Sequence, residues 1–222
     1  MEGRGMIRGV IFDLDGVLVT TDELHYRAWK ELADAEGIHF DRRINDRLRG
    51  VSRMESLEIL LERSPRAYSE EEKAALADRK NARYRELLQA LTPADVLPGA
   101  REMLAGLRAR GVRIAMASSS RNAGLILDRT GLAGAFDAVV DGNDIRHSKP
   151  HPEVFLLAAR RLGLPPAECL VVEDAMAGIE AGRRAGMAVF GIGTPETLPG
   201  VKNLATNLDH VRVDELLRAD RE

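Results

Sequence analysis

The chain has 222 residues, 45% of them hydrophobic, and a formal net charge of -3, which fits one globular domain or a domain with a smaller insert and gives no sign of a nucleic-acid-binding or membrane surface. The single cysteine, Cys169, excludes an intramolecular disulfide and favours a reducing compartment. Because no apolar run reaches the length of a signal-peptide core at the N-terminus or of a membrane span elsewhere, we expect a cytoplasmic protein.

Short apolar strands and amphipathic helices alternate along most of the chain. Strands are predicted at Ile7–Phe12, Val112–Ala117, Asp137–Val140, Leu170–Val172 and Ala188–Ile192. Helices between them are predicted at Ala100–Arg110, Ala123–Thr130, Pro152–Leu162 and Ala177–Ala185, and a glycine follows each of them, as is typical of helix C-termini. This alternation predicts an α/β fold with a doubly wound, mostly parallel, Rossmann-like sheet.

The interval from Thr21 to Thr92 breaks this alternation, because it contains no strand pattern. Three helical segments rich in charge are predicted there, at Glu23–Glu36, Ile44–Glu62 and Glu70–Leu91. We therefore expect a core domain made of residues 1–20 and 93–222 and a small helical cap domain, residues 21–92, inserted just after the first strand.

Polar residues gather where the predicted strands end. The groups that follow the first four strands are Asp13 with Asp15, Ser118 to Asn122, Ser148-Lys149-Pro150, and Glu173 with Asp174. In an open parallel sheet, ligands bind beyond the carboxyl ends of the strands, so we expect these groups to meet at one edge. Carboxylates at this density are the ligands that Mg²⁺ prefers, together with water and a substrate phosphate.

This set of groups also predicts a reaction. A carboxylate can attack phosphorus and form an aspartyl phosphate. A lysine and hydroxyl groups can hold the moving phosphoryl oxygens, and a second carboxylate two residues further on can protonate the leaving oxygen. The sequence therefore predicts phosphoryl transfer.

Each motif alone has a simpler explanation. Asp13-Leu14-Asp15-Gly16 could be a strand-to-turn connection, Glu173-Asp174 could begin a helix, and Ser148-Lys149-Pro150 could be a loop before a helix. His147 and His151 are four residues apart, but with Pro150 between them we do not expect a zinc pair. Only the conjunction of the motifs, in this order and at strand ends, is specific.

With these four groups in this order, the chain resembles the haloacid-dehalogenase-like phosphotransferases over nearly its whole length. Asp13-Leu14-Asp15 is similar to the first motif, Ser118 to the second, Lys149 to the third and Glu173-Asp174 to the fourth. The resemblance implies that Asp13 is the nucleophile, that Asp15 is the general acid/base, and that Ser118 and Lys149 hold the transferring phosphoryl group. It also implies that Mg²⁺ is held by Asp13, the backbone carbonyl of Asp15 and Asp174, with Glu173 close by.

The helical interval is similar to the small cap of the β-phosphoglucomutase branch of this family. The similarity rests on LHYRAW at 24–29, LRGVSRMESL at 48–57, RKN at 79–81 and ASSSRN at 117–122. It implies that His25 couples cap closure to Asp15. It implies a set of residues facing the sugar phosphate: Trp29, Gly50, Val51, Ser52, Arg53 and Lys80. Ser120, Arg121 and Asn122 would join Arg53 around the distal, non-reacting phosphate.

The chain also departs from the family pattern. Thr20 precedes the hinge threonine where an acidic residue is usual, and Ser119 stands where alanine is common. His25 and Trp29 also have simpler explanations, as a helix histidine at the domain seam and as cap core.

The resemblance implies a β-phosphoglucomutase activity that interconverts β-D-glucose 1-phosphate and β-D-glucose 6-phosphate. Its implied cofactors are Mg²⁺ and β-glucose 1,6-bisphosphate, the latter as activator and intermediate. The alternatives are a sugar-phosphate phosphatase of the same superfamily and a non-catalytic sugar-phosphate binding module. We expect a small sugar phosphate as partner, a monomer, and neither nucleic acid nor membrane.

Overall fold

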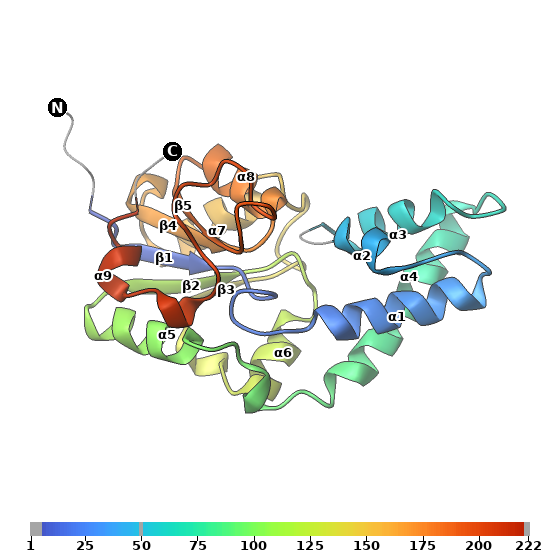
Figure 1. Cartoon of the computed structure of the whole chain (residues 1–222), viewed down its shortest axis with the longest axis horizontal. Helices are drawn as coiled ribbons and strands as arrows, with labels where there is room; N and C mark the ends of the chain where they lie inside the picture. The colour runs from blue at the N-terminus through green and yellow to red at the C-terminus, as the bar shows by residue number, and fades with distance from the viewer. Residues whose placement is uncertain (1–5, 49–50, 220–222) are drawn as a thin grey trace.

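A six-stranded parallel sheet forms the centre of the larger of the two bodies in Figure 1. The structure is a computed structural model that describes residues 6–48 and 51–219. The strands are β1 (Gly9–Phe12), β2 (Arg113–Ala117), β3 (Ala138–Val140), β4 (Cys169–Glu173), β5 (Ala188–Ile192) and β6 (Leu204–Ala205). They lie in the order β3-β2-β1-β4-β5-β6, so the winding of the chain reverses between β1 and β4. Ligand sites form at such reversals.

The register of the sheet aligns the ends of its central strands. Phe12, the last residue of β1, lies opposite Met116 of β2 on one side and Val172 of β4 on the other. All four residues of β1 are buried, as expected for a parallel sheet that is covered on both faces. Residues that follow these three strands are therefore brought to the same edge.

Helices cover both faces of the sheet. On one face, α5 (Ala100–Ala109), α6 (Ala123–Thr130) and α9 (Val213–Leu216) pack in a core that includes Val10; on the other, α7 (Glu153–Leu162) and α8 (Met176–Arg184) pack in a core that includes Ile11. Val10 and Ile11 are neighbours on β1, and successive side chains of a strand point to opposite faces. The prediction of a doubly wound, mostly parallel α/β fold is confirmed.

Two details of the predicted elements are wrong. The single helix expected at Ile44–Glu62 is two helices, α2 (Arg42–Asp46) and α3 (Arg53–Leu61). The second begins at a capping box, in which the Glu55 amide donates to the Ser52 hydroxyl and the Ser52 amide donates to the Glu55 carboxylate. Strand β6 was not predicted, because two residues are too few to show a periodic pattern.

A second body contains α1 (Asp22–Ala35), α2, α3 and α4 (Glu70–Leu88), at the right of Figure 1. It has its own apolar core, in which Trp29 and Leu32 of α1 pack with Leu57 and Leu60 of α3 and Leu76 of α4. These helices form that core because each buries a stripe of apolar side chains along one of its faces. The expected domain boundaries, residues 21 and 92, stay a prediction.

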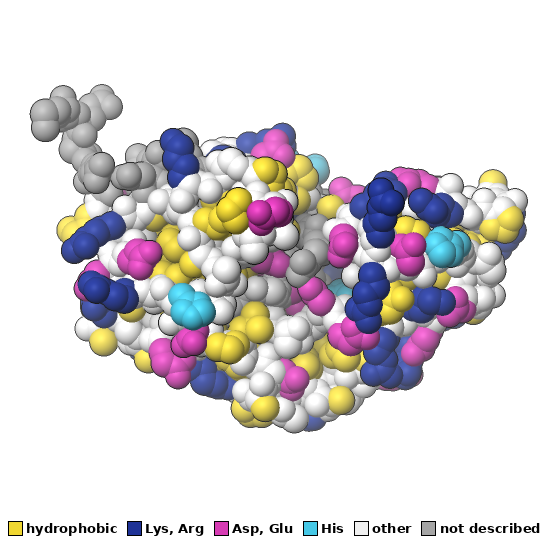
Figure 2. All heavy atoms as spheres, viewed as in Figure 1, with side chains coloured by type: hydrophobic (Ala, Val, Ile, Leu, Met, Phe, Trp, Pro, Cys, Tyr) yellow, Lys and Arg dark blue, Asp and Glu magenta, His cyan; other side chains and the backbone are white. Residues whose placement is uncertain are grey.

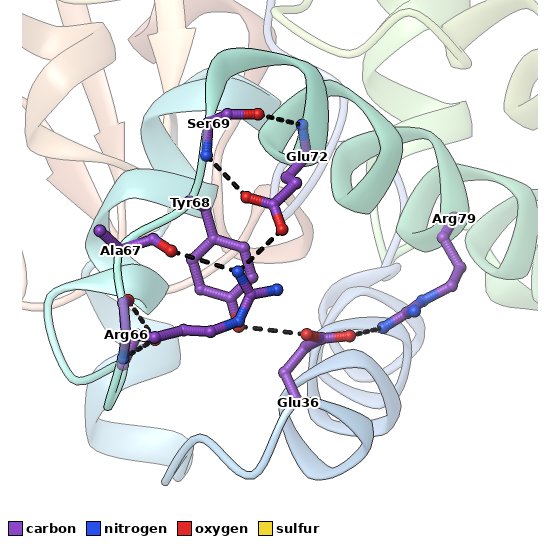
Figure 3. Close-up of polar contacts among 8 residues, drawn as sticks. Glu36, Arg66, Ala67, Tyr68, Ser69, Glu72 and Arg79 are labelled. Atoms are coloured by element: carbon purple, nitrogen blue, oxygen red, sulfur yellow. Dashed lines mark hydrogen bonds and ion pairs between the residues drawn. The ribbon is translucent and has the colours of Figure 1, made fainter.

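Polar contacts tie the far end of this body together (Figure 3). Glu36, which follows α1, accepts hydrogen bonds from the Tyr68 hydroxyl at 3.1 Å and from Arg79 of α4 at 2.6 Å. The Arg66 guanidinium lies 3.7 Å from the centre of the Tyr68 ring and donates to Glu72 at 2.8 Å. Exposed ion pairs contribute little one by one, but this set joins α1, the segment before α4, and α4.

The surface of the α1–α4 body carries charges of both signs, which Figure 2 shows interspersed on this face. Several of them pair across helices, as in Arg83 with Glu31 and Arg47 with Glu62. Within the part of the chain that the structure describes, no helix combines the length and the apolar character that crossing a bilayer requires.

Candidate active site

A cavity of about 460 Å³ is lined both by residues that follow the strands and by residues of α1, α3 and α4. That volume falls in the range of small-molecule sites. Most of the residues singled out from the sequence line it: Asp13, Asp15, His25, Trp29, Val51, Ser52, Arg53, Lys80, Ser118, Ser120, Arg121, Asn122, Lys149 and Asp174. Glu173 lies beside it, bonded to Lys149. Gly50 lies outside the described residues.

Lys149 is the centre of a buried ionic cluster. Its ammonium group donates to Asp13, to Glu173 at 2.8 Å and to the Ala117 carbonyl at 3.3 Å, and only 1% of its side chain is exposed. Burial alone would lower the pKa of Lys149, but the two carboxylates raise it above its ordinary value. Lys149 is therefore held as a cation against Asp13, where it can bind the oxygens of a phosphoryl group.

Three carboxylates form a group that fits a divalent metal ion. Ligand oxygens of Asp13, Glu173 and Asp174 all lie within 4.8 Å of one another. Fully ionised, these carboxylates and Lys149 sum to a charge of about -2, which a divalent cation would balance. Oxygen ligands from a few carboxylates, completed by water, are what Mg²⁺ prefers. The donor set therefore fits Mg²⁺.

The turn after β1 makes room for this group. Gly16 has φ +80°, and a Cβ atom there would lie 2.1 Å from an Asp174 carboxylate oxygen. A glycine is thus required both by the left-handed backbone and by the closeness of Asp174.

Gly16→Ala should raise the Mg²⁺ concentration needed for half-maximal activity by about tenfold or more, because Asp174 must move and even outer-shell changes weaken metal binding by that much. The measurement is a Mg²⁺ titration of activity. Gly37→Ala is a matched control, since Gly37 has φ +68° with nothing within 4 Å of its Cβ position. An unchanged Mg²⁺ requirement in Gly16→Ala would contradict this account of Asp174.

The loop after β2 forms successive turns that fix its hydroxyl groups. The Ser118 hydroxyl accepts a hydrogen bond from the Ser120 amide at 3.1 Å, and the Ser120 hydroxyl accepts one from the Asn122 amide at 3.2 Å. In each case the hydroxyl hydrogen stays available to donate to a ligand. Ser118 lines the same cavity as Asp13. Asn122 also reaches the helical body, where its side-chain amide donates to the side-chain oxygen of Asn81 at 2.9 Å.

Asp15 is bound to the segment that connects β1 with α1. The hydroxyl of Thr21, a fully buried residue, donates to Asp15, and the Tyr84 hydroxyl of α4 donates to Thr21 at 3.2 Å. Burial, with a smaller effect of Asp13, raises the pKa of Asp15 to about 7, although the Thr21 hydrogen bond works against this. A carboxyl with such a pKa can both give and take a proton near neutral pH.

His25 is bound to Lys80. The Nδ1 atom of His25 lies 2.9 Å from Nζ of Lys80, and its ring lies 3.9 Å from that of Tyr84, centre to centre. Burial, together with Lys80, lowers the pKa of His25 well below its usual value, so the neutral ring can accept a hydrogen bond from Nζ of Lys80. The expected link from His25 to Asp15 stays a prediction, and the hydrogen bond that reaches Asp15 comes from Thr21.

The Lys80 amino group is buried beside two aromatic rings. Its Nζ lies 4.7 Å from the centre of the Trp29 ring and 4.5 Å from that of Tyr84, and the residue is 3% exposed. Burial, with a contribution from Arg53, lowers the pKa of Lys80 to about 7. An anionic ligand beside it would restore its charge.

The stability of the ligand-free protein should therefore rise between pH 7 and pH 10 through Lys80. In this range the unfolded chain holds the lysine proton and the folded chain does not, so the free energy of unfolding increases with pH. Relative to Lys80→Met, the wild type should gain up to a few kcal/mol, at about 1.4 kcal/mol per pKa unit. Urea unfolding at several pH values measures this difference. Lys30→Met, at an exposed lysine, is the control. Parallel pH dependence of wild type and Lys80→Met would contradict the assignment.

Two arginines from different bodies line the same cavity. Arg53, the first residue of α3, is 23% exposed and lies 3.8 Å from Asp78, and Arg121 follows β2. Burial lowers the pKa of Arg53, and the positive charge of Arg121 lowers it further. Two guanidinium groups close enough to repel each other are a natural site for a phosphate, which can bind both.

Sequence reasoning missed several residues of this site. Tyr84 was not singled out, and Asn81 and Glu55 appeared only inside the matched segments 79–81 and 48–57, without a role. The hydrogen bond from the Ser148 hydroxyl to Glu55 of α3 at 2.6 Å, which joins the two bodies, was not predicted either. Glu55 carried a signal as the third residue of a capping box. For Tyr84, the only signal in the sequence was its place in the helical pattern of the segment 70–91.

The chain belongs to the haloacid dehalogenase-like hydrolase family, which it matches over residues 7–186. Among its relatives, it is similar to a β-phosphoglucomutase of Bacillus subtilis, at 44% identity over 196 residues that cover 87% of each chain. It is also similar to a phosphorylated carbohydrates phosphatase of Thermotoga maritima, at 33% identity over 84% of this chain and 85% of that one. Among solved structures, a β-phosphoglucomutase of Clostridium difficile matches with a TM-score of 0.90 and 38% identity, over 94% of this chain and 95% of that chain.

Proposed function

We propose that this protein is a β-phosphoglucomutase, which interconverts β-D-glucose 1-phosphate and β-D-glucose 6-phosphate through β-glucose 1,6-bisphosphate. The observation that carries the proposal is that one cavity is lined both by Asp13 with Lys149 and by Arg53 with Arg121. The first pair suits a reacting phosphate and the second pair a phosphate that is only bound. A mutase needs both, because its bisphosphate intermediate carries two phosphates.

In the proposed reaction, Asp13 attacks the phosphorus of the bisphosphate and becomes an aspartyl phosphate, while Asp15 protonates the sugar oxygen that leaves. When the C1 phosphate is the one transferred, glucose 6-phosphate leaves and glucose 1-phosphate enters. Asp15 then takes the proton of its 6-hydroxyl, and the phosphoryl group passes from Asp13 to that oxygen, which forms the bisphosphate again. The bisphosphate reorients so that its C1 phosphate lies at Asp13 for the next turnover. Lys149 and Ser118 bind the oxygens of the transferring group, where charge develops. The raised pKa of Asp15 supports this double role.

Mg²⁺ is the metal ion that we propose for the group of Asp13, Glu173 and Asp174, with the backbone carbonyl of Asp15 as a further ligand. When bound, it neutralises charge on the phosphoryl oxygens. Glu173 also orients Lys149, to which it is bonded at 2.8 Å, and accepts a hydrogen bond from the Ala175 amide. Lys149 is thereby aimed at Asp13.

We propose that residues 21–92 act as a cap that closes over the sugar phosphate and excludes water, so that the aspartyl phosphate passes to sugar. Three contacts between the bodies support this: Thr21 with Asp15, Asn122 with Asn81, and Ser148 with Glu55. His25, Trp29, Val51, Ser52 and Lys80 would contact the sugar phosphate from the cap side, and Ser120 and Asn122 would help bind the distal phosphate. Gly50, outside the described residues, stays part of the same prediction.

A sugar-phosphate phosphatase is the second candidate, since the similar phosphorylated carbohydrates phosphatase belongs to that class. The test supplies β-glucose 1-phosphate with Mg²⁺ and a trace of β-glucose 1,6-bisphosphate, and measures glucose 6-phosphate against free phosphate. A mutase yields mainly glucose 6-phosphate. Free phosphate as the main product would replace the proposal with the phosphatase.

A further inference from the structure

A second cluster of metal-ligand side chains lies on the surface of the sheet body, in the segment that contains Lys149. His147, His151 and Glu153 each offer a ligand atom within 4.8 Å of the others. Both histidines are at least half exposed, with 64% and 50% of their side chains accessible. None of the three lines the cavity of the candidate active site.

The local backbone brings the two histidines together. The His151 amide donates to the Ser148 carbonyl at 2.9 Å, so the chain turns back between them, and the ring centres lie 4.6 Å apart. Pro150, because of which no zinc pair was expected, lies within this turn. The two rings meet across a turn.

Glu153 is held in place by the backbone. Its two carboxylate oxygens accept hydrogen bonds from the amides of Arg146, at 3.2 Å, and His147, at 2.9 Å. The carboxylate is also the first-turn acid of α7. Outer contacts that orient a ligand in this way strengthen metal binding, because less order has to be imposed when the ion arrives.

The distances match a tetrahedral ion. The Nδ1 atoms of His147 and His151 lie 3.0 Å and 4.0 Å from the same Glu153 oxygen. Ligands about 2.0–2.1 Å from a tetrahedral zinc ion are about 3.3 Å apart, a value between these two. His151 would give up only a long hydrogen bond of 3.3 Å from the Glu153 amide.

The types of ligand atom indicate which class of metal ion the cluster would bind. Two imidazoles and one carboxylate suit Zn²⁺ and its first-row neighbours Co²⁺ and Ni²⁺, whereas Mg²⁺ prefers all-oxygen sites such as that of Asp13, Glu173 and Asp174. We propose that His147, His151 and Glu153 form a second metal site, which binds one divalent transition-metal ion of the zinc class with water as fourth ligand. The site ties together the two ends of the segment that contains Lys149.

The test uses full-length protein without a polyhistidine tag, in excess Mg²⁺ so that the carboxylate site is occupied. Zn²⁺ binding is measured by calorimetry, and Co²⁺ binding by its visible spectrum, whose intensity reports tetrahedral geometry. The wild type should bind one equivalent. His147→Ala and His151→Asn, the latter able to keep the hydrogen bond from Glu153, should each weaken binding by about tenfold or more. His39→Ala, at another exposed histidine beside an acid, is the control and should bind as the wild type does.

Hydrogen exchange gives an independent measurement. Zn²⁺ should slow amide exchange within residues 147–153 in the wild type and in His39→Ala, but not in His147→Ala. The proposal is overturned if the wild type binds no Zn²⁺ in excess Mg²⁺. It is equally overturned if His147→Ala and His151→Asn bind as tightly as the wild type, in which case the cluster is only a hydrogen-bonded start of α7.

Discussion

Asp13→Asn should abolish turnover of β-glucose 1-phosphate while leaving the protein folded. An amide oxygen is too weak a nucleophile to attack phosphorus, and no aspartyl phosphate can form without the carboxylate. Asp13 lies against Lys149 at the end of β1, where only 7% of the residue is exposed. The substitution keeps its shape and size, so the buried site loses charge but no volume.

The measurement combines steady-state turnover with the stoichiometry of phosphoryl transfer from a small acyl phosphate. Asp144→Asn is a matched control, because Asp144 is a carboxylate of the same body that pairs with Arg161 and does not itself line the cavity. It should keep wild-type turnover. Far-ultraviolet circular dichroism and thermal unfolding establish that both variants are folded. Substantial residual turnover of Asp13→Asn in a preparation free of the wild type would show that another group is the nucleophile.

The position of Asp13 was predictable because parallel strands impose a simple geometry. Once Ile7–Phe12, Val112–Ala117 and Leu170–Val172 are recognised as strands of one sheet, the residues that follow them must meet at its carboxyl edge. The register of β1 with β2 and β4 meets this expectation to within one residue, because Phe12 lies opposite Met116 and Val172. The closeness of Asp13, Glu173 and Asp174 could therefore be predicted from the pattern of apolar strands and from where these residues follow them in the sequence.

Contacts between the two bodies could not be predicted in the same way. Tyr84 reaches Thr21 across 63 residues of sequence, and which face of α4 turns toward Thr21 depends on how α1 and α4 pack. Periodicity assigns Tyr84 to a buried stripe of α4, but it does not say whether that stripe packs within the α1–α4 body or against the segment that connects β1 with α1. The prediction for His25 was limited for the same reason, since its bond to Lys80 also depends on the packing of α1 with α4.

Local hydrogen bonds determine the structure at two places where the sequence pattern was not sufficient to predict it. The predicted helix Ile44–Glu62 kept an apolar period through the break, and only the Ser52–Glu55 capping box marks the new start. His147 and His151 meet because of a turn that a spacing rule for helices does not describe. The first case depends on hydrogen bonds between side chain and backbone, and the second on a hydrogen bond within the backbone, from the His151 amide to the Ser148 carbonyl.

Arg53→Ala should separate mutase from phosphatase activity. Arg53 belongs to α3 and lines the cavity with Arg121, while the reacting carboxylates follow strands of the other body. Its proposed task is to bind the distal phosphate with two parallel donors, which a lysine cannot reproduce. A hydrogen bond to a charged group contributes about 1.5–3 kcal/mol, so the loss of two amounts to a few kcal/mol.

Because each 1.4 kcal/mol or so is a factor of ten, Arg53→Ala should lower kcat/KM for glucose 6-phosphate formation by roughly two decades or more. Hydrolysis of the aspartyl phosphate on Asp13 needs no bound distal phosphate, so it should fall much less, and the ratio of glucose 6-phosphate to free phosphate should drop. Arg53→Lys should recover only part of the loss. Arg47→Ala, at an exposed arginine of the same body that pairs with Glu62, should change neither product. A proportional fall of both products in Arg53→Ala, or no change in either, would make Arg53 a structural residue of α3 and would favour the phosphatase.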